Sequence, residues 1–370
     1  MKRIEYIKVL LFVLCILCFM QGCMDDDLLW QNQPITPPST TEGVFIINEG
    51  NFMYGNASLS YYDPEEMMVY NDVFFNVNGL PLGDVAQSMT IRDNLGYIVV
   101  NNSGRIYVID IETFELKGKI TGLTSPRYIH FINEEKAYVT DLYAKAIAIV
   151  NPKTYELTDT ISVDNQETTF YQHPTDQMVQ IGKYIYTNAW SFDNQILIID
   201  TETDQWVDKI EVPIQPQSMV VDKMGKLWVL SDGGFDGNPY GHEPPALVRI
   251  DPESRQIETT YWFELQDQAM SLTINSTRDT LYFINRHVYR HPVTSDAFPE
   301  MFIESFFPAG TLGGFRALGV DPNTSEVYVG DAIDFVQPGI VYRFRPQGQP
   351  IDTLRVGISP GNFAFKVTKP

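Results

Sequence analysis

The chain has few cysteines, and their positions exclude a disulfide framework. All three of them, Cys15, Cys18 and Cys23, lie within the first 23 of its 370 residues. No cysteine is therefore left to cross-link the rest of the chain, which must be stabilised by a buried core. The roughly 325 residues that follow the N-terminal region are enough for such a core.

Positive charge is also scarce. The sequence holds 26 lysines and arginines against 47 aspartates and glutamates, and its net charge is −21. A surface of this sign repels phosphate backbones, so no nucleic-acid partner is expected, and protein charge would not hold the chain on an anionic membrane. Any attachment to a membrane would have to come from acyl chains.

Long apolar runs are confined to the N-terminus. Val9–Met20 is apolar, basic residues precede it, and the small residue Gly22 follows it, which is the pattern of a secretory signal. The run is too short to be kept as a membrane span. This segment resembles a bacterial lipoprotein signal, which implies that residues 1–22 are removed and that lipid is attached to Cys23.

Three acidic residues, Asp25, Asp26 and Asp27, follow closely behind Cys23. The cluster resembles the export signal with which Bacteroidota place lipoproteins on the outer face of the outer membrane. We therefore expect a protein that is anchored in the outer membrane through Cys23 and faces the cell exterior. A retained anchor or an ordinary secreted protein is the alternative. Residues 23–42 are mostly polar and contain prolines, so we expect a flexible tether there.

From residue 43 onward the chain repeats a unit of roughly 40 to 50 residues, a period typical of solenoids and propellers. Two copies are Pro126–Val163 and Pro174–Val212. Each copy contains four short segments rich in β-branched and aromatic residues, and turn residues separate these segments. Other copies begin near Ala86, Pro216, Ala269 and Ala317.

A turn of similar composition follows the third segment of each copy. It recurs at Asp63-Pro64, Asp110-Ile111, Asn151-Pro152, Asp200-Thr201, Asp251-Pro252, His291-Pro292 and Arg345-Pro346. Seven turns predict seven units, and no stretch keeps a helical period long enough to matter. We therefore predict an all-β fold over residues 43–370, a seven-bladed β-propeller of four-stranded blades.

The two ends of the repeat region predict how the ring closes. The first unit begins at Gly43–Ile47, which matches the second strand of other units and has no first strand before it. At the other end, Ser359–Phe365 aligns with Pro126–Phe131, the first strand of its own unit. An open solenoid would instead have a cap at each end. We expect the C-terminal strand to complete the first blade and close the ring.

Loops on one face of the predicted ring carry aromatic and amide side chains. In a propeller, the loops between second and third strands and the connections between blades emerge on the same face. Exposed aromatic residues rimmed by polar groups mark binding sites, although some of these rings could pack beneath their own loops. The candidate ligand-binding residues are Asn51, Phe52, Tyr54, Asn101, Asn102, Arg127, Tyr143, Trp190, Gln217, Phe235, Tyr240, Arg316 and Phe335. Of these, Arg127, Gln217 and Arg316 are expected in the connections between blades.

Signals for enzymatic chemistry are weak. The five histidines include no close metal pair, since His287 and His291 lie in a predicted strand where they would not converge. No nucleophile elbow, phosphate loop or zinc spacing appears, and Asp232–Asn238 lacks the alternation of a calcium loop. We expect no catalytic residues and no metal site. A lactonase-type hydrolase that uses acids around the central channel stays open as an alternative.

Six short motifs carry a family resemblance. They are NEGN (Asn48–Asn51), ASLSYYDP (Ala57–Pro64), LGDVAQ (Leu82–Gln87), VVNNSGRIYVID (Val99–Asp110), PRY (Pro126–Tyr128) and YVTDLY (Tyr138–Tyr143). Together they resemble the surface lipoprotein propellers of Bacteroidota, a group also described as YncE-like, over about residues 43–365. Within that group the chain is most similar to the BtuG-type cobalamin-binding lipoproteins.

The resemblance implies a capture protein without catalytic residues or cofactor. Its ligand would be cobalamin, or vitamin B12, or a related corrinoid, and its partner a TonB-dependent outer-membrane transporter that receives the ligand. A corrin ring is a wide disc fringed with amides, so a binder needs apolar area and many hydrogen bonds. Trp190 and Tyr143 could supply area, and Arg127 and Arg316 could meet amides and the nucleotide phosphate. A propeller that binds another nutrient, a glycan or a protein partner is the alternative.

Overall fold

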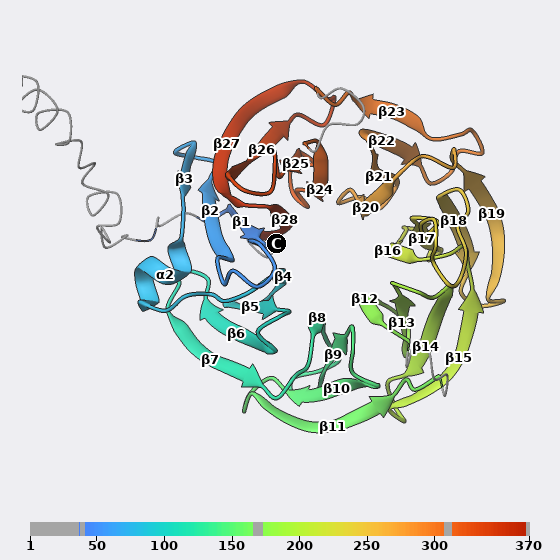
Figure 1. The fold of residues 1–370 in the computed structure, drawn as a ribbon, viewed down its shortest axis with the longest axis horizontal. Helices are drawn as coiled ribbons and strands as arrows, with labels where there is room; N and C mark the ends of the chain where they lie inside the picture. Colours follow the sequence, from blue (N-terminus) through green and yellow to red (C-terminus); the bar gives the residue numbers. More distant parts are fainter. Residues whose placement is uncertain (1–36, 38–40, 166–172, 307–312, 368–370) are drawn as a thin grey trace, which may run out of the picture. The chain divides into compact units, whose positions relative to one another are not determined.

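The apolar segments of the repeat region form 28 strands within the described residues, and these strands make seven antiparallel sheets of four. The computed structural model describes residues 37, 41–165, 173–306 and 313–367. Residues 37–370 make up one compact unit. In Figure 1 its sheets follow one another around a central axis, with the first strand of each sheet nearest the centre. The prediction of a seven-bladed β-propeller is confirmed.

Each sheet is one blade, whose strands are named from the innermost to the outermost. The blades are β28 (Pro360–Lys366), β1 (Gly43–Asn48), β2 (Ser58–Asp63) and β3 (Met68–Tyr70); β4 (Ala86–Arg92), β5 (Leu95–Val100), β6 (Arg105–Asp110) and β7 (Leu116–Thr121); β8 (Pro126–Phe131), β9 (Ala137–Asp141), β10 (Ala146–Asn151) and β11 (Glu156–Ser162); β12 (Thr175–Ile181), β13 (Tyr184–Ala189), β14 (Gln195–Asp200) and β15 (Gln205–Glu211); β16 (Pro216–Val221), β17 (Leu227–Ser231), β18 (Ala246–Asp251) and β19 (Gln256–Trp262); β20 (Ala269–Ile274), β21 (Thr280–Asn285), β22 (His287–Pro292) and β23 (Glu300–Ile303); and β24 (Phe315–Val320), β25 (Val327–Asp331), β26 (Pro338–Phe344) and β27 (Pro350–Ile358).

The described part of the chain adds one short helix, α2 (Val73–Asn78), in the connection between the first and second blades. The sequence pattern had no helical period there, and the helix is only six residues long. Val73 and Phe74 are its buried residues, and the Phe74 ring lies 4.9 Å from the ring of Tyr107. The helix therefore covers the side of the next blade and does not alter the all-β fold.

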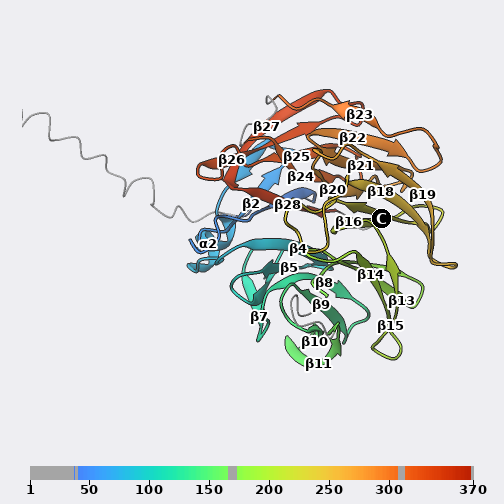
Figure 2. The same ribbon diagram turned by 45° about the vertical axis from the view of Figure 1, so that its right-hand side comes forward.

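Burial explains why the middle strands of each blade are so apolar. The second and third strands have neighbours on both faces, and β9 and β13, for example, are buried along almost their whole length. Strands covered on both faces lose the alternation of apolar and polar residues. The outer strands β11, β15 and β19 are mostly exposed, and they run along the periphery in both views of the ring (Figures 1 and 2).

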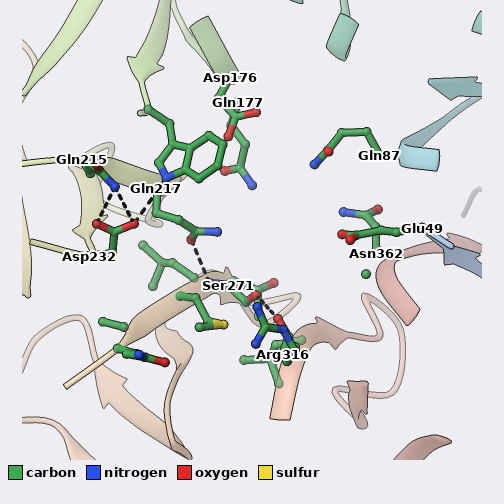
Figure 3. Close-up of a pocket in the computed structure, with 18 of the residues that line it drawn as sticks. Glu49, Gln87, Asp176, Gln177, Gln215, Gln217, Asp232, Ser271, Arg316 and Asn362 are labelled. Carbon is green, nitrogen blue, oxygen red and sulfur yellow. Dashed lines mark hydrogen bonds between the residues drawn. The ribbon is translucent and has the colours of Figure 1, made fainter. Parts of the chain in front are cut away.

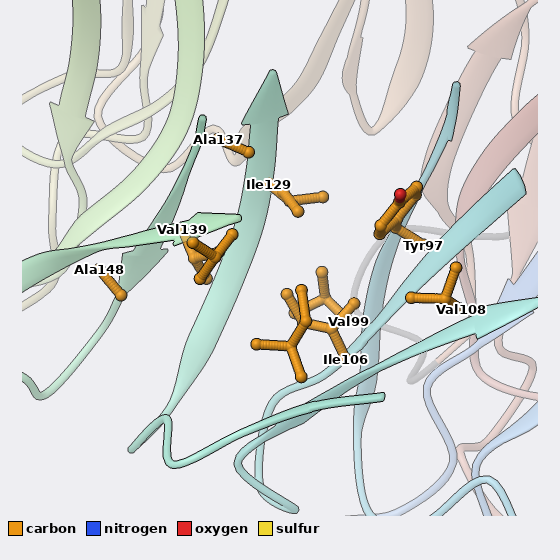
Figure 4. Packing of buried hydrophobic residues seen from close by; sticks show 10 residues of the cluster. Tyr97, Val99, Ile106, Val108, Ile129, Ala137, Val139 and Ala148 are labelled. Carbon is orange, nitrogen blue, oxygen red and sulfur yellow. The ribbon is translucent and has the colours of Figure 1, made fainter. Parts of the chain in front are cut away.

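The core consists of apolar layers between neighbouring blades. Figure 4 shows one layer, in which Val99 and Ile106 of the second blade face Ile129 and Val139 of the third. Similar clusters fill five further interfaces between neighbouring blades. Burial of this kind stabilises the fold by roughly 25 cal/mol per Å² of apolar surface, so the blades are held by face-to-face packing without any disulfide.

The ring closes as predicted. β28 pairs with β1 in antiparallel register from Gly43 opposite Lys366 to Asn48 opposite Pro360. The innermost strands of adjacent blades also contact one another around the whole circle, and β28 contacts both β24 and β4. The fit around β28 is close, because a Cβ placed on Gly339 would lie 2.4 Å from the Pro360 ring. The C-terminal strand thus completes the first blade.

Candidate functional site

The first strand of each blade borders the central channel, and its pairing with the second strand is interrupted near its start. The pairing skips Gln87 in β4, Gln217 in β16 and Arg316 in β24. In β8 and β12 it skips two residues each, beginning with Arg127 and Asp176. A bulge bends the strand and changes the direction of a side chain. In these five blades it places a polar or charged side chain on the channel wall.

The two remaining blades differ. In β20 the interruption falls at Ser271 and Leu272. In β28 it falls at Gly361, which has no side chain to contribute. The carboxylate of Glu49, just beyond the end of β1, takes that place, because a Cβ on Gly361 would lie 2.2 Å from Glu49 Oε1. The glycine therefore leaves the space that the Glu49 carboxylate occupies.

These side chains surround a cavity of about 1040 Å³ at the centre of the ring. In Figure 3, Gln87, Asp176, Gln217, Arg316 and Glu49 lie around an open centre. The volume is at the upper end of the range for small-molecule sites. Gln177, Gln215, Asp232, Phe235, Trp190, Phe335 and Asn362 also line the cavity. The site thus combines amides, charges and aromatic rings.

Arg127 is held on all sides by the protein. Its Nε donates to Asp176 Oδ1 at 2.8 Å, and its Nη1 donates to Gln87 Oε1 at 2.6 Å. Its guanidinium also lies 5.2 Å from the centre of the Trp190 ring. The side chains of Arg127 and Asp176 are only 12% and 4% exposed. This buried pair orders the wall of the cavity, and its burial leaves little of the Arg127 side chain exposed to a ligand.

Arg316 lies in a different environment. It is exposed to the cavity, and its guanidinium lies 4.7 Å from the centre of the Phe335 ring. No salt bridge to Arg316 occurs in the described ranges. Burial raises the pKa of the nearby Glu49 carboxyl, and the positive charges of Arg127 and Arg316 oppose part of that rise. Arg316 therefore has donors available for a ligand.

A hydrogen-bond network fixes Trp190. Its Nε1 donates to Asp232 Oδ2 at 3.3 Å, and Gln215 Nε2 donates to Asp232 Oδ1 at 3.0 Å. Asn238 Nδ2 donates in turn to Gln215 Oε1 at 2.6 Å. Burial raises the pKa of the Asp232 carboxyl, and its hydrogen bonds with Gly234, Trp190 and Gln215 oppose part of that rise. The indole is thus positioned before any ligand arrives.

The structure brings about half of the predicted binding residues together. Those that line the cavity are Arg127, Trp190, Gln217, Phe235, Arg316 and Phe335. Arg127, Gln217 and Arg316 were expected in connections between blades, and they lie instead within β8, β16 and β24. The correction follows from the bulges, which turn strand residues toward the channel.

The other predicted residues do not line this cavity. Phe52, Tyr54 and Tyr143 are exposed on their loops, and Tyr240 is half-buried on its loop. Asn51 Nδ2 donates to the carbonyl of Phe335 and so ties two neighbouring loops together. These residues occupy loops between second and third strands, as expected, but lie outside the lining of the cavity.

Asn101 and Asn102 have partners within the protein. Asn101 is buried, and its Nδ2 donates to the Pro126 carbonyl at 3.1 Å. Asn102 Nδ2 donates to Asp84, which also accepts hydrogen bonds from the backbone of Met53. Their amides therefore order loops. Cys23, the predicted lipidation site, lies outside the described residues.

Several cavity residues were not predicted from the sequence, namely Glu49, Gln87, Asp176, Gln177, Gln215, Asp232 and Asn362. A signal for some of them was available. Gln87 and Asp176 occupy the same second position of their strands as Arg127 and Gln217. Aligning the units by their first strands would have found both.

The described residues were compared with the requirements of a metal site and of a membrane-spanning helix. Within residues 37, 41–165, 173–306 and 313–367, no group of three or more histidines, cysteines, aspartates or glutamates is arranged to hold a metal ion. In the same part of the chain, no helix is both long enough and apolar enough to cross a membrane.

Comparisons with known proteins identify relatives of this fold. The profile of a family described as "Domain of unknown function (DUF5074)" matches residues 42–351. A search of curated proteins found no match. A quinonprotein alcohol dehydrogenase-like protein from Bacteroides thetaiotaomicron is 15% identical over 88% of this chain and 78% of its own, with a TM-score of 0.67.

Two further solved structures are similar. The periplasmic gluconolactonase of Pseudomonas aeruginosa is 13% identical over 89% of this chain and 100% of its own, with a TM-score of 0.65. A putative 6-phosphogluconolactonase from Bacteroides fragilis is 13% identical over 89% of this chain and 99% of its own, with a TM-score of 0.61. Identities this low establish a shared fold, and they leave the chemistry of the cavity to be argued from its residues.

Proposed function

The chain belongs to the DUF5074 family, and from that premise we propose that it captures cobalamin or a related corrinoid in its central cavity. It binds the ligand without catalysis and passes it to a TonB-dependent outer-membrane transporter. The observation that carries the proposal is the composition of the cavity. Aromatic rings of Trp190, Phe235 and Phe335 surround it together with the side chains of Gln87 and Gln217.

This composition suits a wide, amide-fringed disc. Aromatic side chains give a corrin ring broad apolar contact, and glutamine amides can both donate to and accept from its carboxamides. The network around Asp232 holds Trp190 in place, and the Asp176 pair holds Arg127. A wall that is ordered before binding reduces the entropic cost of association.

Calorimetry tests this proposal. The full-length protein in detergent is expected to bind cyanocobalamin with nanomolar affinity, and Trp190→Ala to weaken binding by about 2 kcal/mol or more, which is roughly 30-fold. Tyr143→Ala is the matched control, because Tyr143 is also an aromatic loop residue but does not line the cavity. Its affinity should stay within about twofold of the wild type.

Other results would point elsewhere. No heat at millimolar cyanocobalamin would remove the corrinoid proposal, and hydrolysis of gluconolactone above the buffer rate would favour a lactonase-type enzyme. An equal loss for Trp190→Ala and Tyr143→Ala would show that the ligand lies over the outer loops and not in the cavity.

We propose in addition that lipid on Cys23 anchors the protein in the outer membrane, facing the cell exterior. The signal before Cys23 and the acids behind it support this location. Wild-type protein should be found in the outer-membrane fraction and be cleaved when intact cells are treated with protease. Cys23→Ser should abolish incorporation of labelled palmitate and release the protein from the membrane. Labelling that persists in this variant would refute acylation at Cys23.

A further inference from the structure

Two pairs of oppositely charged side chains line the cavity, and only one of these pairs forms a salt bridge. Arg127 and Asp176, from adjacent blades, form a salt bridge at 2.8 Å. Arg316 and Glu49 also come from adjacent blades, on β24 and just after β1. Neither of these two has a salt bridge to a described residue, although both line the cavity. Glu49 and Arg316 therefore form no salt bridge with each other, although the charges of Arg127 and Arg316 both act on the Glu49 carboxyl. We call Glu49 and Arg316 the open pair.

The open pair is built into the fold. Glu49 reaches the cavity across Gly361, where a Cβ would overlap the position that its carboxylate takes. The backbone on either side is fixed, because Glu49 N donates to the Ser359 carbonyl at 2.8 Å and Ala86 N donates to the Glu49 carbonyl at 3.3 Å. The backbone of Arg316 is fixed as well, because Ser271 Oγ donates to the Arg316 carbonyl at 2.9 Å (Figure 3). Both side chains thus extend from rigid positions.

The chemistry of the open pair limits what it can hold. A simple anion would pair with Arg316 but would be repelled by Glu49, and a simple cation would have the opposite difficulty. A primary carboxamide satisfies both charges, because its carbonyl oxygen accepts from a guanidinium while its N–H groups donate to a carboxylate. Charge-assisted hydrogen bonds of this kind are roughly twice as strong as neutral ones.

We infer that Glu49 and Arg316 together bind one neutral carboxamide of the ligand, and that Arg127, whose side chain is only 12% exposed in its salt bridge with Asp176, is a positioning residue. This assignment rests on the proposed corrinoid function, since corrinoids carry carboxamides around the ring. From the sequence, Arg316 was expected to meet amides and the nucleotide phosphate, and the assignment retains only the amide.

The test compares two probes by calorimetry on the full-length protein in detergent. Cyanocobalamin carries both carboxamides and a phosphodiester, whereas dicyanocobinamide carries carboxamides and lacks the nucleotide. Glu49→Gln and Arg316→Gln are each expected to weaken binding about tenfold, and by the same factor for both probes. Arg345→Gln is the control, because Arg345 is exposed and lies outside the cavity. It should leave both affinities unchanged.

The sign of the Glu49→Gln effect decides the assignment. If Arg316 bound an anion, Glu49→Gln would remove a repulsion and tighten cyanocobalamin binding, and Arg316→Gln would weaken cyanocobalamin alone. That pattern would overturn the carboxamide assignment while the capture function stood. A wild-type protein that binds neither probe would overturn the proposed function and this assignment with it. Two controls separate a loss of affinity caused by the side chain from one caused by misfolding. Arg316→Lys keeps the positive charge, and near-ultraviolet circular dichroism shows whether each variant is folded.

Discussion

A chain truncated after Ser359 is expected to lose its cooperative thermal melt. β28 pairs with the whole of β1, in which every residue is buried. Without it, the apolar edge from Val44 to Ile47 would face solvent and the contacts of the inner ring with β24 and β4 would be lost. Exposed apolar edges favour aggregation. Circular dichroism should show a broad, shallow transition in place of a single steep one.

The control for this truncation is a chain that ends at Lys366. That chain keeps all of β28, including the pair between Lys366 Nζ and Glu112 Oε2 at 2.7 Å. Its melting temperature should match that of the full-length protein. If the chain ending at Ser359 also melted as the full-length protein does, the closing strand would not be what holds the ring together.

Replacing Arg127 by methionine is expected to destabilise the protein by about 3–5 kcal/mol. The change leaves the Asp176 carboxylate, only 4% exposed, without its cationic partner. It also removes the hydrogen bond to Gln87 and the contact with the Trp190 ring. A buried charge that loses its partner costs far more than an exposed one. Urea unfolding followed by fluorescence measures the change in the free energy of unfolding.

Two further variants separate the buried charge from general packing. Arg127→Met combined with Asp176→Leu should recover most of the lost stability, because no unpaired charge is left. Arg290→Met breaks an exposed pair, in which Arg290 and Glu300 are 38% and 59% exposed, and should cost under about 1 kcal/mol. If Arg127→Met cost no more than Arg290→Met, the central pair would not stabilise the ring.

The seven-bladed propeller could be predicted from the sequence because it depends on local and repeated patterns. Turns such as Asp251-Pro252 recur once per blade, and the middle strands are continuous apolar runs wherever two neighbours cover them. The first unit, at Gly43, lacks a first strand, and the C-terminal segment at Pro360 is a strand without a unit of its own. Ring closure accounts for both, because these two segments pair with each other. Short-range signals therefore sufficed for the number of blades and for their connection.

The cavity could be predicted only in part, because it depends on bulges. Which way Arg127, Gln217 or Arg316 points is decided by the pairing of its strand with a partner further along the chain. Periodicity within a strand does not report where that pairing skips a residue. The place of Glu49 is harder still to predict. Its side chain occupies the space beside Gly361, which has no side chain and lies on a strand far away in the sequence.

The loop residues show a second limit. The sequence shows that an amide or ring is present on a loop, but not whether the protein itself already uses it. The Asn101 amide is bound to the Pro126 carbonyl, whereas Tyr143 extends into solvent. Both outcomes are set by contacts between segments distant in sequence, which neither composition nor spacing reveals.

The seam between β1 and β28 runs along the central cavity. Glu49 follows the first of these strands, and Gly361 and Asn362 on the second form the wall beside it. A nascent chain emerges with its N-terminus first, so Glu49 is made long before the wall that completes its surroundings. The ability to bind a ligand should therefore arise in one step, when β28 pairs with β1 and closes the ring. Fragments that lack the closing strand would not bind the proposed ligand, and only the complete ring could hold it.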